Sequence, residues 1–97
     1  MPESDEPPVF EIPIEESIDL HTFAPRDIPA VVEGYLGAAS ERGYEVVRLI
    51  HGKGKGVQRR AVRELLRDHH LVEEFFDAPP GFGTWGATIA RLRSPEG

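Results

Sequence analysis

The stretch YEVVRLIHGKGKGVQRRAVRELLRDHH, residues 44–70, places a strand, a glycine-rich turn and a helix in direct succession. Residues 44–51 are rich in β-branched side chains and predict a strand that ends in His51. Glycine then occupies every second position from 52 to 56, where it permits positive φ angles and a close approach of the backbone to a ligand. A helix is predicted over residues 57–68. This succession is typical of an α/β domain.

The predicted helix over residues 57–68 is amphipathic. We expect its apolar residues to form two adjacent rows, Val57, Ala61 and Leu65 in one and Val62 and Leu66 in the other. A third row at helical spacing is basic and is expected on the solvated side: Arg59, Arg63 and Arg67. Glu64 is placed to pair with Arg60 or Arg67. His69 and His70 follow the helix, where its C-terminal dipole favours them.

The segment before residue 44 predicts one strand and one helix. In the strand SIDLH, Ile18 and Leu20 point to one face, and Asp19 and His21 point to the other. The helix is predicted over residues 25–43. Its apolar face consists of Ile28, Val32, Tyr35, Leu36 and Ala39. Its start is marked by Pro25 and Pro29 and its end by Gly43.

The segment after residue 70 predicts two further strands, residues 71–78 and 86–93, joined by the Pro/Gly loop APPGFGTWG. Strands connected through helices should be parallel, and the last strand should run antiparallel to the third because a loop joins them. The predicted fold is a two-layer α/β sandwich of order β-α-β-α-β-β, with a mixed four-stranded sheet and both helices on one face.

The composition predicts one small domain of 97 residues. We assign residues 1–16 to an acidic, flexible arm, residues 17–93 to the domain and residues 94–97 to a tail. The sequence has no cysteine, which excludes disulfides and thiolate chemistry. It lacks a membrane-spanning apolar run and a signal peptide, so we expect a cytoplasmic monomer that does not bind membranes.

The charge is unevenly distributed. The chain has a net charge of −6, yet residues 51–70 hold six basic and two acidic side chains and carry +4. Residues 1–19 hold seven acidic and no basic side chains. A basic patch on an acidic protein indicates a localised anionic partner.

The predicted topology brings the chemically active residues to one edge of the sheet. The first two strands should end together, which places Asp19, His21 and His51 near each other. The glycine turn leaves the same edge and enters the N-terminus of a helix, where free N–H groups favour an anion. We therefore predict a phosphate cradle beside two imidazoles. Its expected phosphate-binding residues are Gly52, Lys53, Gly54, Lys55, Gly56, Arg59 and Arg60.

The cradle does not match a nucleotide site. GKGKG is not the GxxxxGK[ST] loop of nucleoside triphosphatases, nor the G-x-G-x-x-G of dinucleotide folds with its later acidic residue. The basic row continues beyond one phosphate, which favours a polynucleotide over a nucleotide cofactor. No HxH or HExxH spacing is present, so we expect no tightly bound metal or cofactor and leave stimulation by a divalent cation open.

The chain resembles the Smr domain, the small MutS-related domain found in some MutS paralogues and in stand-alone proteins. The motifs that carry the likeness are IDLH at 18–21, HGKGKG at 51–56 and GTWGATIARL at 83–92. The resemblance implies the fold of the C-terminal domain of bacterial translation initiation factor three. It also implies nicking endonuclease activity on branched DNA, a link to DNA repair or recombination, or in some members RNA cleavage or binding. Thr88 lies within the third motif and is implied to contact phosphate.

One position departs from the family pattern. Members commonly have glycine directly after the histidine of the first motif, whereas this chain has Thr22 followed by Phe23. The departure changes the backbone freedom beside His21.

Three functional hypotheses follow. In the first, Asp19 orients His21, which moves a proton during phosphodiester cleavage, and His51 protonates the leaving oxygen or contacts phosphate. In the second, the same cradle binds DNA or RNA without cleaving it, and His51 only caps the loop. In the third, the acidic arm covers the basic patch in a protein-interaction domain. Within the loop, Trp85 or Phe82 is interpreted as a base-stacking residue. For Trp85 the alternative is a place in the core under the loop, which we favour.

Overall fold

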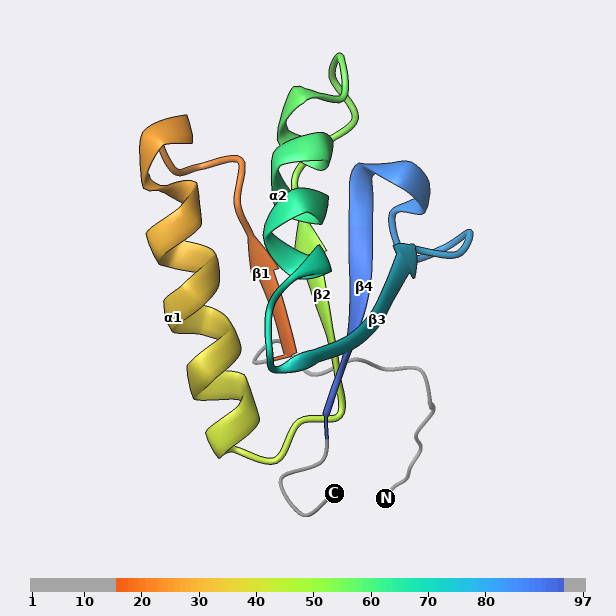
Figure 1. Cartoon of the computed structure of the whole chain (residues 1–97). Helices are drawn as coiled ribbons and strands as arrows, with labels where there is room; N and C mark the ends of the chain where they lie inside the picture. Colours follow the sequence, from red (N-terminus) through yellow and green to blue (C-terminus); the bar gives the residue numbers. More distant parts are fainter. Residues whose placement is uncertain (1–15, 94–97) are drawn as a thin grey trace, which may run out of the picture.

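The computed structural model describes residues 16–93 (Figure 1). The predictions for the acidic arm and the tail therefore lie outside the described residues, except at Glu16. Two short 3₁₀ turns, Pro25–Asp27 and Thr84–Gly86, precede α1 and β4. The helices and strands are β1 (Ser17–Asp19), α1 (Ile28–Glu41), β2 (Val46–Ile50), α2 (Val57–Arg67), β3 (Val72–Asp77) and β4 (Ala87–Leu92).

The four strands form one mixed sheet in the order β1-β2-β4-β3. β1 is parallel to β2 with Asp19 opposite Ile50, and β4 is antiparallel to both β2 and β3. Ile50 in turn lies opposite Ala87, so the end of β2 meets the start of β4. The predicted order and strand directions are confirmed.

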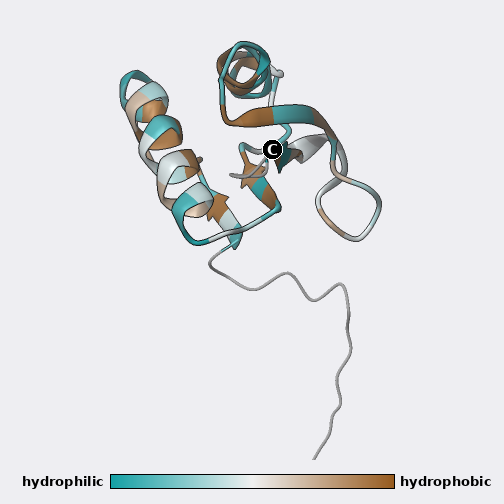
Figure 2. Cartoon of the chain, turned by 60° about the horizontal axis from the view of Figure 1, so that its bottom comes forward, coloured by the Kyte–Doolittle hydropathy of each residue, from teal (hydrophilic) through white to brown (hydrophobic). Residues whose placement is uncertain are grey.

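Both helices cover one face of the sheet and bury the main core against it (Figure 2). Val47 and Leu49 of β2 point to this face and are completely buried. α1 contributes the apolar row predicted from its spacing, and four of its members are buried: Ile28, Val32, Leu36 and Ala39. Pro29 lies in the first turn of α1, and Gly43 ends the helix region with a φ of 80°. Burying each large aliphatic side chain contributes roughly 1.5–3 kcal/mol.

Only one of the two predicted apolar rows of α2 faces the core. Val62 and Leu66 are buried and Leu65 is half-buried, whereas Val57 is 71% exposed and Ala61 is also exposed. The prediction for Val57 and Ala61 was wrong. α2 packs over β3 and β4 in an orientation that directs a single apolar row toward the sheet.

The opposite face of the sheet carries a smaller apolar cluster beneath the β3–β4 loop. Ala87 and Ile89 of β4 pack there against Ala78, and Phe82 packs against the cluster from the loop. Phe82, one of the two base-stacking candidates, is thus partly buried against the sheet. The side chain of Trp85 lies outside the described residues. No helix within residues 16–93 is long and apolar enough to cross a membrane.

Candidate functional site

An aspartate and a histidine form a hydrogen-bonded pair where β1 ends. Asp19 Oδ1 lies 2.5 Å from Nδ1 of His21 and also accepts the backbone N–H of His21 at 3.1 Å. The two side chains are 46% and 64% exposed, respectively. The hydrogen bond from His21 lowers the pKa of the Asp19 carboxyl, so the carboxylate stays ionised. Asp19 therefore fixes the orientation of the imidazole and leaves Nε2 on its far side.

The turn after β1 is closed by local hydrogen bonds. The N–H of Phe23 donates to the carbonyl of Leu20 at 3.1 Å, and the Thr22 hydroxyl reaches the carbonyl of Asp19 at 3.5 Å. Thr22 has no positive φ angle, so the backbone here does not require the glycine that the family commonly has.

His51 leaves the same edge of the sheet but is buried, with 3% of its surface exposed. Its Nδ1 lies 3.0 Å from the carbonyl oxygen of Gly52, and its Nε2 lies 2.8 Å from the hydroxyl of Thr88. A carbonyl only accepts, so Nδ1 carries the proton and a neutral ring accepts at Nε2 from Thr88. Burial lowers the pKa of His51, as do the positive charges of Arg59 and Arg63. Both ring nitrogens thus have protein partners.

Thr88 is completely buried, in contrast to the other expected phosphate-binding residues. It lies on β4 opposite Leu49 of β2, and its hydroxyl is directed to His51. The structure therefore brings Thr88 to the site through His51.

The glycine turn has the predicted backbone. The φ angles of Gly52, Gly54 and Gly56 are 86°, 38° and 87°, in a region that residues other than glycine rarely adopt. The N–H of Gly56 donates to the carbonyl of Lys53 and closes the turn. Among residues 16–93 no side chain caps the N-terminus of α2, so its first N–H groups remain available for an anion. The exposed side chains of Lys53 and Lys55 flank this turn.

Gly86 anchors the glycine turn and was not among the site residues predicted from the sequence. Its carbonyl accepts the N–H of His51 at 3.1 Å and the N–H of Gly52 at 2.8 Å. A Cβ at this position would lie 3.0 Å from Cγ of Lys53, so the two segments touch without space for a side chain. The available signal was the position of Gly86 inside the third motif.

The basic row on α2 is not a solvated row. Arg59 binds the carboxylate of Asp77 through Nη2 at 2.8 and 3.0 Å, and Arg63 binds the same carboxylate at 3.0 Å. Both side chains are half-buried, and the Arg63 guanidinium lies 4.9 Å from the ring centre of Phe75. The prediction was wrong for these two residues because Asp77 ends the neighbouring strand β3.

Arg67 is the exposed member of the basic row, as expected. It pairs with Glu64 at 2.8 Å, which selects one of the two predicted partners of that carboxylate. Arg60 makes no ion pair within residues 16–93. The basic residues near the turn thus differ in how far their charge is already neutralised.

The histidines after α2 lie away from this edge. His69 Nε2 lies 2.7 Å from the carboxylate of Glu33 on α1, and its Nδ1 accepts the N–H of Leu71. His70 stacks on His69 with a centroid distance of 4.9 Å. His69 thus bridges the two helices, a contact that the helix-dipole argument did not predict. Within residues 16–93 no three His, Asp or Glu side chains are grouped as metal ligands.

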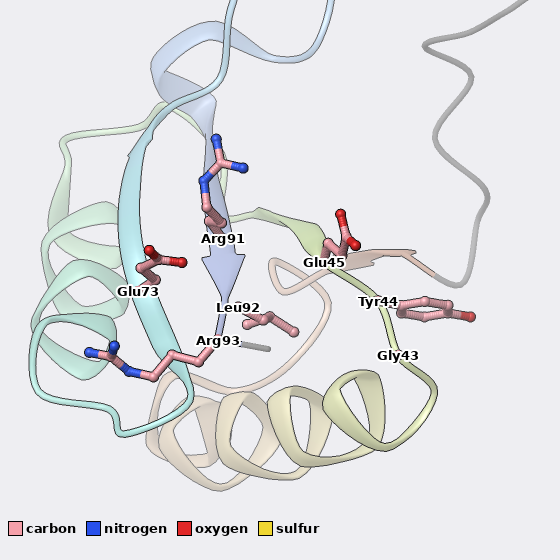
Figure 3. A pocket seen from close by; sticks show the side chains of 7 residues that line it. All are labelled: Gly43, Tyr44, Glu45, Glu73, Arg91, Leu92 and Arg93. Atoms are coloured by element: carbon pink, nitrogen blue, oxygen red, sulfur yellow. The ribbon is translucent and has the colours of Figure 1, made fainter. Parts of the chain in front are cut away.

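A hollow of about 280 Å³ lies at the opposite end of the sheet (Figure 3). Tyr44 and Glu45 line it from the start of β2, and Glu73 lines it from β3. Arg91 and Arg93 come from the end of β4, with Arg93 turned toward the α2–β3 turn, where its Nε donates to the carbonyl of His70. Acidic and basic groups therefore alternate around this hollow.

The fold and the site define a small α/β domain with an exposed Asp–His pair and a glycine-rich turn at one edge of its sheet. The Smr domain model matches residues 18–93, and the chain belongs to this family. The resemblance predicted from the three motifs is confirmed.

The chain is similar to proteins named Endonuclease MutS2. It is 41% identical over 78 residues to that of Thermus thermophilus and 41% identical over 80 residues to that of Caldicellulosiruptor saccharolyticus. These alignments cover 80% and 82% of this chain but 10% of each relative. The chain thus spans about a tenth of the length of the curated relatives it matches.

Two crystal structures are similar to the whole domain. The Smr domain of Thermus thermophilus MutS2 has a TM-score of 0.77 at 41% identity and covers 80% of this chain and 98% of that one. YdaL, a stand-alone small MutS-related protein from Escherichia coli, has a TM-score of 0.80 at 23% identity, covering 93% of this chain and 80% of that one. The second likeness supports the fold alone.

Proposed function

We propose that this domain binds nucleic acid and cleaves a phosphodiester bond at the edge formed by Asp19, His21 and the glycine turn. The observation that carries the proposal is an exposed imidazole, oriented by a carboxylate, beside a backbone turn built to hold an anion. β1 pairs with β2 so that Asp19 lies opposite Ile50, and both strands release their next residues at one edge. The similarity to proteins named as endonucleases supports the same reaction class.

His21 acts as the general base in this proposal. Its Nδ1 is held by Asp19, so Nε2 accepts the proton of the attacking hydroxyl, from water or from a ribose 2′-OH. The new O–P bond forms while the bond to the leaving oxygen breaks, and the leaving oxygen takes up a proton from solvent water. Proton transfer by a positioned group of this kind contributes roughly 10²–10⁴-fold to the rate.

The glycine turn stabilises the negative charge of the transition state. The first N–H groups of α2 and the turn itself act on the non-bridging phosphate oxygens, since donors fixed before the reaction need no reorganisation. Lys53 and Lys55 add positive charge and are free to approach the substrate from solvent. Gly52, Gly54 and Gly56 allow the backbone to approach closely.

We assign His51 and Thr88 a positioning role. The two nitrogens of His51 are occupied by Gly52 and Thr88, and its lowered pKa keeps the ring neutral near pH 7. This arrangement supports holding the carbonyl of Gly52, and with it the turn, over moving a proton. His21 is then the single proton carrier of the site.

The test compares wild type, His21→Ala and His70→Ala, the last being an exposed histidine outside this edge. Each is incubated with supercoiled DNA, a branched DNA and a structured RNA, with Mg²⁺ or with EDTA. We expect cleavage by wild type and His70→Ala, and loss of cleavage with retained binding in His21→Ala. The EDTA arm decides whether a divalent cation takes part.

Two results would overturn this proposal. Binding of a substrate without cleavage by any of the three proteins would leave a nucleic-acid-binding module that uses the same cradle. Equal cleavage by wild type and His21→Ala would remove the assignment of Asp19 and His21.

A further inference from the structure

A basic hollow of about 320 Å³ extends from the glycine turn along α2. Gly56 and Glu64 contribute to its lining. Its other lining residues are all basic: Lys55, Arg59, Arg60, Arg63 and Arg67. The hollow therefore begins at the proposed cradle and continues along the helix surface.

The hollow has more basic side chains than carboxylates that pair with them. Glu64 neutralises Arg67 at 2.8 Å, and Asp77 is shared between Arg59 and Arg63. The five cations thus meet two carboxylates, which leaves a net charge of +3 around one concave surface. Neither Lys55 nor Arg60 makes an ion pair with any residue of the described range 16–93. A surface with this excess attracts an anion.

Asp77 fixes two of the arginines before any ligand arrives. It binds Arg59 through Nη2 and Nε and binds Arg63 through Nη1, while the ring of Phe75 supports the Arg63 guanidinium. A guanidinium has five N–H donors, so donors remain on both arginines. Side chains that are already ordered lose less conformational entropy when a ligand binds.

The distance from the glycine turn to the hollow matches the distance between nearby phosphates of one nucleic-acid strand. Arg60 and Arg63 follow Gly56 by four and seven residues, which corresponds to about 6 and 10 Å along the helix axis. One strand of a duplex rises about 3.4 Å per nucleotide, so this distance spans about two to three nucleotides. The next phosphates of a strand that leaves the glycine turn along α2 would therefore meet this hollow.

We propose that this hollow is a second phosphate subsite, and that the nucleic-acid strand runs from the glycine turn along α2. The inference rests on the proposed function and specifies its substrate. The substrate is a polynucleotide that continues for at least two to three nucleotides on one side of the scissile bond. Arg60 and Lys55 bind its phosphates directly. Arg59 and Arg63, already held in place by Asp77, line the subsite.

The test measures binding as a function of oligonucleotide length and salt concentration. A fluorescently labelled 12-nucleotide single strand and a labelled dinucleotide are titrated with wild type, Arg60→Gln and Arg42→Gln. Arg42 follows α1 at the opposite end of the sheet and is the matched control for the loss of one charge. Lys55→Gln serves as a second variant on the hollow.

We expect Arg60→Gln to weaken binding of the 12-nucleotide strand about three- to tenfold at low salt. The slope of log K against log salt should decrease by roughly 0.7, the value for one single-strand phosphate contact. Binding of the dinucleotide should be unchanged, and Arg42→Gln should behave as wild type. Lys55→Gln should act in the same direction as Arg60→Gln.

An unchanged salt slope in both Arg60→Gln and Lys55→Gln would overturn the subsite. An equal loss for the dinucleotide and the longer strand would do the same, since it would place Arg60 at the scissile phosphate. His21→Ala separates this proposal from the nuclease. If that variant and the wild type both fail to cleave but retain the length dependence, the nuclease proposal fails and the subsite stands.

Discussion

The two ends of the sheet have similar groups but use them differently. At the far end, Arg91 pairs with Glu74 at 2.8 Å, and Arg93 donates to the carbonyl of His70 at 3.0 Å. At the near end, where β1 and β2 finish, Lys53 and Lys55 are exposed and make no ion pair within residues 16–93. Both ends are charged. The candidate binding surface differs from the rest of the charged surface because these lysines lack a carboxylate partner within residues 16–93.

The backbone shows the same contrast. At the far end, Gly43 also has a positive φ angle, but its N–H donates to the carbonyl of Ser40 and completes the end of α1. At the near end, Gly56 begins α2 without a capping side chain. A glycine that ends a helix satisfies the backbone, whereas a glycine that begins one here leaves N–H groups available. The positive φ angle alone does not identify the site.

The strongest test of the contrast removes one paired carboxylate at each end. Asp19→Asn removes the acceptor that orients His21, and we expect cleavage to fall about 100-fold or more, in kcat rather than in KM. Glu74→Gln removes the partner of Arg91 and should leave cleavage within about twofold of wild type. Steady-state kinetics on the cleaved substrate measure both. Similar losses in the two variants would show that Asp19 acts only through stability.

The link between β4 and the near end is tested through the Thr88 hydroxyl. Thr88→Val keeps the shape but leaves Nε2 of buried His51 without its partner, so we expect a loss of about 1–3 kcal/mol in the free energy of unfolding. Thr88→Ser keeps the hydroxyl and should lose less. Urea denaturation followed by circular dichroism measures the difference. Equal stability of Thr88→Val and wild type would contradict the proposed role of this hydrogen bond.

A smaller effect is expected from a methyl group at Gly86. Gly86→Ala places a Cβ 3.0 Å from Cγ of Lys53 and displaces that side chain, and we expect nucleic-acid affinity to fall by up to about tenfold, which corresponds to ~1.4 kcal/mol. Gly34→Ala on α1 is the matched control because a Cβ there meets nothing within 4 Å. That control should stabilise the helix by roughly 0.5–1 kcal/mol and leave affinity unchanged. Fluorescence anisotropy measures the affinity. Unchanged affinity in Gly86→Ala would show that the turn tolerates the shift.

The smallest expected effect is a pH dependence of stability. The folded protein holds the pKa of His51 below the ordinary value of 6.5, so the unfolded chain takes up the proton first. Stability from this residue is present above pH 6.5 and decreases as the pH falls below it, by at most about 1.4 kcal/mol per pH unit. His51→Asn should flatten this dependence between pH 5 and pH 6.5, relative to wild type and to His70→Asn. An unchanged slope would indicate that folding does not lower the pKa of His51.

The sequence predicted the fold well because its local signals agreed with one another. Alternation in SIDLH put Asp19 and His21 on one side, and the structure joins them by a hydrogen bond. The three glycines from 52 to 56 have the predicted positive φ angles, which glycine adopts without steric cost.

The missed features all depend on residues far apart in the chain. Asp77 reaches Arg59 and Arg63 only because β3 lies beside α2, and Thr88 reaches His51 only through the register of β4. Periodicity identifies an apolar stripe on a helix but not the orientation in which the helix packs on the sheet. The position of Val57 relative to the core was therefore predicted wrongly. Pairing across the sheet decides which candidate residues are free to act.

β1 has only three residues and forms one edge of the sheet, with β2 as its single neighbouring strand. Short edge strands open at lower free energy than the central strands of a domain. Opening of β1 would separate Asp19 and His21 from the glycine turn while β2, β4 and the core stay folded. Amide hydrogen exchange at Ile18 and Leu20 would then report how often the Asp19–His21 pair lies beside the glycine turn, independently of the global stability of the domain.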